Sequence, residues 1–135
     1  MKIRFLIGAL ALGCAFQASA GVVVVSAQSR ATAMNAEAVK RAFLGRDDTI
    51  GGAVAVVVYQ KGGATRTEFE RGVLGKSGAE LASYWSRLVF TGKAKAPKEL
   101  DGDAAVKAKV ASNPGAIGYI SDGAVDSSVK VVYKF

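Results

Sequence analysis

The apolar residues of this chain form short uninterrupted runs and stripes at helical spacing. Residues 22–25 and 53–59 are two runs without alternating polar positions. Runs of this kind are typical of strands that are covered on both faces. AIGYIS and VKVVY predict two further strands, with Asp122-Gly123 as the turn signal between them. The lysine in VKVVY favours an edge position for the last strand.

Four segments have the pattern of amphipathic helices. In residues 35–45, Asn35 is the expected N-cap and Gly45 the expected end. Residues 65–75 begin with Thr65 and Glu68, spaced as a capping box. A fourth helix is expected over residues 103–112, before the helix-breaking sequence Asn-Pro-Gly.

The third helix, within residues 77–92, begins with Ser77 and Glu80 at the capping-box spacing and has the clearest stripe of the four. Its apolar positions follow the i, i+3, i+4, i+7 spacing at Leu81, Tyr84, Trp85 and Leu88. At this spacing we expect Tyr84 and Trp85 to belong to the core rather than to a ligand site. The order β-α-β-α-α-α-β-β predicts one α/β domain, in which a mixed, mostly parallel sheet has helices on both faces.

The first twenty residues have the three parts of a secretory signal peptide. A basic start, an apolar stretch and Ala18-Ser19-Ala20 predict cleavage near Ala20 and export to the periplasm or the medium. The domains are therefore expected to be the signal peptide, 1–20, and the α/β domain, 21–135. Cys14 leaves lipidation open as an alternative. No later segment is long and apolar enough to span a bilayer.

Composition limits the chemistry that is open to this protein. The chain has no histidine and a single cysteine, Cys14, which would leave with the signal peptide. Triads that need histidine, thiol nucleophiles and the usual zinc sites are thereby excluded. Asp47 and Asp48 form the only adjacent pair of acids, and we expect them in a turn. We therefore expect that the protein is not an enzyme and that it has no catalytic residue, cofactor or metal.

The positive charge of the chain is modest and spread out. Removing the signal peptide would lower the net charge from +7 to +5, because it takes two basic residues and no acidic one. The densest basic part is Lys93, Lys95 and Lys98. A nucleic-acid binder would show a sharper basic stripe with interleaved aromatic residues, so nucleic acid is not an expected partner.

The candidate ligand site lies where the second apolar run ends. The sequence continues as Gly62, Gly63, Ala64, Thr65 and Arg66. A helix N-terminus presents unpaired N–H groups and a partial positive charge, so it favours oxyanions. A tight turn with a capped helix is the other interpretation of these residues, since the glycines match no nucleotide-binding motif.

Several segments resemble, in the same order, the phosphate-binding proteins of bacterial ABC transporters and their periplasmic-binding-protein-like relatives. They are VKRAFLGR, GGATRTEFERGVLGKSGAELASYWSRLVFTGKAKAPKEL and VASNPGAIGYIS. The resemblance implies a type 2 periplasmic-binding fold, in which two α/β lobes grip the ligand. Members of that family are more than twice as long, so this chain would form a single three-layer lobe.

The resemblance also implies a phosphate grip of the form Arg-x-Asp-Gly-Ser-Gly-Thr. Only Gly62 and Thr65 match it, and Tyr59, Lys61, Gly63 and Ala64 occupy the other four specified positions. The missing arginine and serine would supply the stronger hydrogen bonds to an oxyanion. Arg66 would compensate in part.

Two hypotheses follow from these observations. The first is an exported solute-binding-like protein that binds a small, phosphate-like oxyanion weakly, with a second subunit completing the site as a homodimer. The alternative is a periplasmic or extracellular interaction module that keeps the fold, has lost the ligand and binds an envelope protein.

Overall fold

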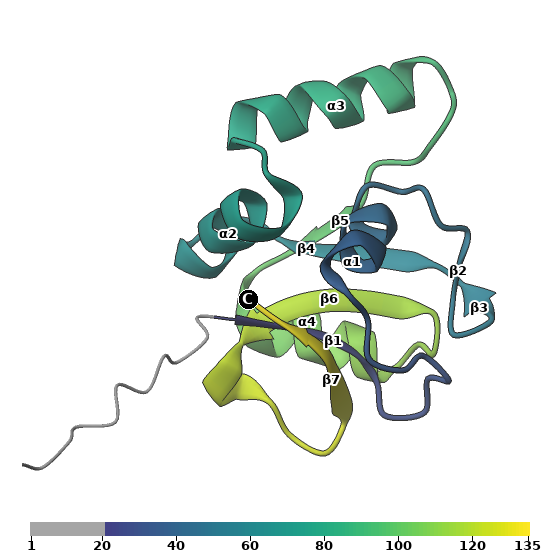
Figure 1. The fold of residues 1–135 in the computed structure, drawn as a ribbon, viewed down its shortest axis with the longest axis vertical. Helices are drawn as coiled ribbons and strands as arrows, with labels where there is room; N and C mark the ends of the chain where they lie inside the picture. Colours follow the sequence, from purple (N-terminus) through teal and green to yellow (C-terminus); the bar gives the residue numbers. More distant parts are fainter. Residues whose placement is uncertain (1–20) are drawn as a thin grey trace, which may run out of the picture.

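The computed structural model describes residues 21–135, shown in Figure 1. The predicted signal peptide and Cys14 lie outside the described residues. The strands are β1 (Gly21–Ser26), β2 (Thr49–Ile50), β3 (Ala53–Val54), β4 (Val56–Gln60), β5 (Lys98–Leu100), β6 (Ala116–Ser121) and β7 (Val129–Lys134). The helices are α1 (Ala36–Phe43), α2 (Ala64–Phe69), α3 (Gly78–Phe90) and α4 (Gly102–Ala111). A π-helical turn (Glu70–Leu74) extends α2, and a 3-10 turn (Asp122–Ala124) follows β6.

Five strands form the main sheet in the order β5-β4-β6-β1-β7. β4 pairs in parallel with β5 and β6, whereas β1 pairs antiparallel with β6 and β7. Four of these five strands therefore point the same way and β1 alone is reversed. This confirms the predicted mixed, mostly parallel sheet, and β7 lies at its edge as predicted.

Both faces of the sheet are covered, and the valine run of β1 alternates between the two cores. Val23 and Val25 belong to the core that includes α1, α2 and α3. Val22 and Val24 belong to a smaller core with Val106 of α4. Figure 1 shows α4 across the sheet from α1. An uninterrupted apolar run is what a strand needs when each face is buried, so the first strand is confirmed.

Aromatic side chains fill the larger core. The rings of Phe69 and Tyr119 stack with centroids 4.2 Å apart, and Phe43 meets Phe69 edge-on at 4.6 Å. Trp85 packs edge-on against Tyr59 and is buried, so its predicted place in the core is confirmed. This cluster holds the end of α2 against β4 and β6.

Two helix caps follow the prediction. The Asn35 side chain accepts a hydrogen bond from the Ala38 amide at 2.8 Å, and α1 starts directly after it. Ser77 caps α3 in the same way, accepting from the Glu80 amide at 3.2 Å. Each cap satisfies an amide that the helix itself leaves unpaired.

The single strand predicted over residues 53–59 is wrong. Gly51 and Gly52 have positive φ, and they reverse the chain so that β2 and β3 form a small hairpin. The chain then enters the main sheet only at Val56. The two glycines were the available signal, because positive φ is easily adopted by glycine alone.

β5 was missed as well, because its sequence Lys-Glu-Leu has no apolar run. It lies at the sheet edge, where polar side chains are tolerated. Lys98, which the sequence placed only in a basic cluster, pairs in this strand with Val58. The fourth helix starts one residue before its predicted bound.

Candidate functional site

Three parallel strands have their carboxyl ends side by side, at one end of the sheet. β4 ends at Gln60, β5 at Leu100 and β6 at Ser121, and α2 starts beside these ends. Ligands of open α/β sheets bind beyond the carboxyl ends of such strands. The predicted site residues 62–66 lie beside these strand ends.

α2 begins earlier than the predicted capping box requires. Its N-cap is Gly63, with φ 96° and ψ 173°, and no side chain caps the helix. The predicted Thr65–Glu68 capping box is therefore wrong, because Thr65 already lies inside the first turn. A side chain at Gly63 would be strained by the positive φ, although a Cβ there would meet nothing within 4 Å. The space in front of this turn is open.

The first turn of α2 leaves hydrogen-bond donors free. Among the described residues, the amides of Ala64, Thr65 and Arg66 have no hydrogen-bond partner. The Thr65 hydroxyl lies 3.2 Å from the Ser121 hydroxyl at the end of β6. Gly62, Gly63 and Ala64 are exposed, and Thr65 is half-buried. The first turn of α2 and the end of β6 thus present three free amides and two hydroxyls.

Arg66 does not face solvent as a free cation. Its Nε lies 2.6 Å from Glu70 Oε1, and its Nη1 lies 3.0 Å from Glu99 Oε1. The same Nη1 donates to the Gln60 carbonyl at 2.7 Å. Burial alone would lower the pKa of Arg66, but these carboxylates reverse the effect and hold the pKa above its ordinary value. Two carboxylates therefore neutralise the positive charge of Arg66, which was predicted from the sequence to contact the anion.

Tyr59, at the position of the missing arginine, is a core residue. Its ring is buried, and its hydroxyl donates to the Phe43 carbonyl. Burial raises the pKa of Tyr59 above its ordinary value, and the neighbouring indole of Trp85 opposes this shift. In the described part of the chain, the indole N–H itself makes no hydrogen bond that satisfies normal geometry. Tyr59 therefore supports α1 and offers nothing to an anion.

The sequence did not identify the polar residues behind the site. Asp103 Oδ1 accepts from the Gln60 side chain at 2.7 Å and from the Ser121 amide at 3.1 Å. The Tyr119 hydroxyl accepts from the Gln60 amide at 3.1 Å. Asp103 lies in the first turn of α4, and its carboxylate holds the ends of β4 and β6 together. Knowledge of which strands are neighbours was needed to find this cluster.

Other expectations concern metals and membranes. No group of three or more metal-ligating side chains occurs within residues 21–135. None of the helices in this part of the chain combines the length and apolar character needed to cross a membrane.

Solved structures of phosphate-transport proteins share this fold. A protein from Clostridium perfringens, assigned as a phosphate ABC transporter substrate-binding protein and solved with bound phosphate, aligns with a TM-score of 0.66 and 24% identity. An ABC-type phosphate transport receptor from Vibrio cholerae gives 0.66 and 23%. PstS from Borrelia burgdorferi gives 0.63 and 13%. These similarities confirm the predicted periplasmic-binding-protein-like fold.

The alignments cover 84% of this chain but only 44%, 45% and 46% of the three solved chains, respectively. The protein thus spans less than half the length of these neighbours, in agreement with a single lobe. No protein-family model and no curated protein matches the sequence significantly.

Proposed function

We propose that this protein is an exported, single-lobe solute-binding protein that binds a small oxyanion such as phosphate weakly. The observation that carries the proposal is the position of the glycine-rich start of α2, at the carboxyl ends of three parallel strands in a fold shared with phosphate-transport proteins. The alternative of an interaction module without a ligand is not favoured by these similarities.

The oxyanion would bind to backbone amides and hydroxyls rather than to a cation. The free amides of Ala64, Thr65 and Arg66 point from the first turn of α2. The hydroxyls of Thr65 and Ser121 bond to each other, so this pair adds one further donor. Amides in this arrangement bind anions without a dedicated side chain. The carboxylate of Asp103, bound to the Ser121 amide, lowers the local potential and keeps the affinity low.

Weak binding also follows from the openness of the site. Exposed residues on one lobe leave most of an anion hydrated, whereas tight sites bury most of their ligand. A second copy of the chain would supply the missing wall. We therefore expect a dissociation constant on the order of 1 mM, equivalent to about 4 kcal/mol, for one copy.

Calorimetric titration with phosphate, sulfate and phosphonate tests this function. The decisive variant is Ala64→Pro, because proline fits the first helical position and removes one free amide without changing charge. Losing one hydrogen bond to an anion is expected to lower the affinity about tenfold. Ala36→Pro is the matched control, since Ala36 is the exposed first residue of α1.

The outcomes separate clearly. Weaker binding by Ala64→Pro, with unchanged binding by Ala36→Pro, supports the site. An absence of heat and of any thermal shift at millimolar anion would refute the function. Sedimentation of the protein with and without phosphate tests the second subunit, and mass spectrometry of the exported protein tests cleavage near Ala20.

A further inference from the structure

α3 lies apart from the sheet and ends in exposed apolar side chains. Only Leu81 and Trp85 of this helix are buried. Figure 1 shows α3 above the rest of the fold, with its C-terminal end pointing away from α2. At that end, Phe90 is 93% exposed and Val89 is 46% exposed. An aromatic side chain that is almost fully in water contributes little to the packing of this fold.

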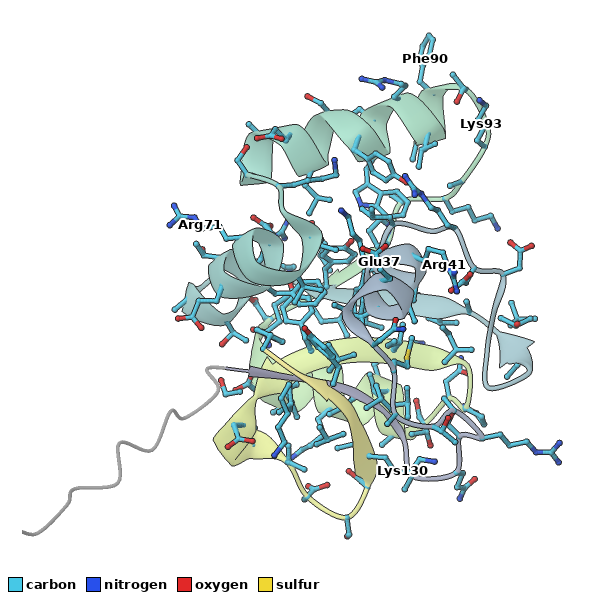
Figure 2. The ribbon with its side chains drawn as sticks, viewed as in Figure 1. Glu37, Arg41, Arg71, Phe90, Lys93 and Lys130 are labelled. Atoms are coloured by element: carbon cyan, nitrogen blue, oxygen red, sulfur yellow. The ribbon has the colours of Figure 1, made fainter. Side chains whose placement is uncertain are left out.

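The same end of α3 carries a local positive charge. Residues 81–98 contain four basic residues and no acidic one. These cations are Arg87, Lys93, Lys95 and Lys98, and all are exposed. In residues 21–135 none of the four forms an ion pair. Figure 2 shows Phe90 and Lys93 at the same outer end of the molecule.

Acidic groups near these lysines are fewer than the cations. Asp47 and Asp48 line the same groove as Lys93, Lys95 and Lys98. Asp47 is paired with Arg41 at 3.4 Å. The outer end therefore keeps a positive field that favours an anionic surface.

We propose that this α3 tip, defined as Arg87, Val89, Phe90, Lys93, Lys95 and Lys98, docks on a bilayer that contains anionic phospholipids. Phe90 and Val89 enter the headgroup region, and the surrounding cations contact lipid phosphates. Aromatic and basic side chains in one exposed patch are the usual composition of an interfacial anchor.

A lipid surface fits this tip better than a folded protein does. A stable protein interface buries about 800 Å² on each partner around an apolar centre. The tip offers two apolar side chains at a protruding helix end, with exposed cations before and after them in the chain. A bilayer needs no matching concave surface, and each lysine near an anionic membrane strengthens binding about fivefold.

Vesicle co-sedimentation tests the proposal. The full chain is expressed with its own N-terminus, and mass spectrometry defines the N-terminus that each purified variant carries. Phosphatidylcholine vesicles are compared with vesicles that also contain phosphatidylglycerol. We expect binding to the anionic vesicles, a loss of roughly tenfold for Phe90→Ser and a loss of about 25-fold for Lys93→Ala/Lys95→Ala.

Two variants elsewhere on the surface serve as controls. Val54→Ser removes an exposed apolar side chain, and Lys109→Ala removes a cation of α4. Val54→Ser is expected to leave binding unchanged, and Lys109→Ala to have less effect than the double lysine variant. Circular dichroism checks that every variant is folded. Ala64→Pro should bind vesicles like the parent, which separates this surface from the proposed anion site.

Three results would overturn the docking surface. They are no binding to anionic vesicles, binding that Phe90→Ser and the double lysine variant leave unchanged, and binding to soluble polyglutamate but not to vesicles. The last result would identify an acidic macromolecule as the partner instead of a membrane.

Discussion

Replacing Arg66 with methionine removes the only cation that contacts the buried carboxylate of Glu70 within the described residues. The Arg66 side chain is 19% exposed and that of Glu70 is 8% exposed, with 2.6 Å between Nε and Oε1. Methionine keeps most of the apolar stem, so packing changes little. The variant therefore isolates the effect of the charge.

The expected cost lies between two reference cases. Exposed ion pairs contribute about 0–1 kcal/mol, whereas breaking a fully buried pair costs about 3–5 kcal/mol. This pair is mostly but not fully buried, so we expect Arg66→Met to lower the free energy of unfolding by about 2–3 kcal/mol. In a domain of this size, the melting temperature would fall by roughly 10 °C.

Urea and thermal denaturation of Arg66→Met, Glu70→Gln and the double variant measure the effect. Glu70→Gln removes the buried charge, so the double variant should be more stable than the sum of the single changes by about 1–2 kcal/mol. Arg87→Met is the matched control, because Arg87 is exposed and unpaired within residues 21–135. Its effect should stay within about 0.5 kcal/mol.

A cost for Arg66→Met no larger than that of Arg87→Met would refute the reasoning. So would strict additivity in the double variant. Loss of anion binding in Arg66→Met with unchanged stability would show that Arg66 is a ligand residue, and that its ion pairs open when the anion binds.

Three further predictions concern the fold. Asn35→Ala removes the cap of α1 and should cost about 1 kcal/mol in urea denaturation, with exposed Ser83→Ala as control. Gly115→Ala should lower the free energy of unfolding by about 3 kcal/mol or more, or prevent soluble expression, because a Cβ would clash with the Val54 carbonyl oxygen. Gly123→Ala is the control and should behave like the parent, since a Cβ there meets nothing within 4 Å. Burial raises the pKa of Tyr119 from 10.0 to about 12, so the stability that this shift contributes, roughly 3 kcal/mol, is fully present below pH 10 and is lost as the pH rises towards 12. Unfolding followed from pH 8 to pH 12 checks this loss, and unchanged stability over that range would contradict it.

Local signals in the sequence were sufficient for most elements but not for their pairing. The caps at Asn35 and Ser77 were predictable because each bonds to an amide three residues away. The split between β3 and β4 was missed because Ala55, inside an apolar run, donates instead to the Asp48 carbonyl at 2.9 Å. This hydrogen bond continues the β2–β3 hairpin, and such a bond leaves no periodic mark in the sequence.

The candidate site divides in the same way. The position of residues 62–66 after a strand was predictable, since glycines between a strand and a helix mark such a turn. The role of Arg66 was not, because Glu99 reaches it only when β5 pairs with β4. The hydroxyl of Ser121 meets Thr65 only when β6 lies beside β4.

The sequence by itself determined the fold class, the two faces of β1 and the position of the glycine-rich turn after a strand. These depend on hydrophobic periodicity and on neighbours within about four residues along the chain. Only the tertiary structure decided that the glycine-rich turn of residues 62–66 has free amides but no free cation. Charge balance there is set by Glu70 and Glu99, and the second of these comes from a strand that lies far away in the sequence. Packing, rather than local propensity, places those charges together.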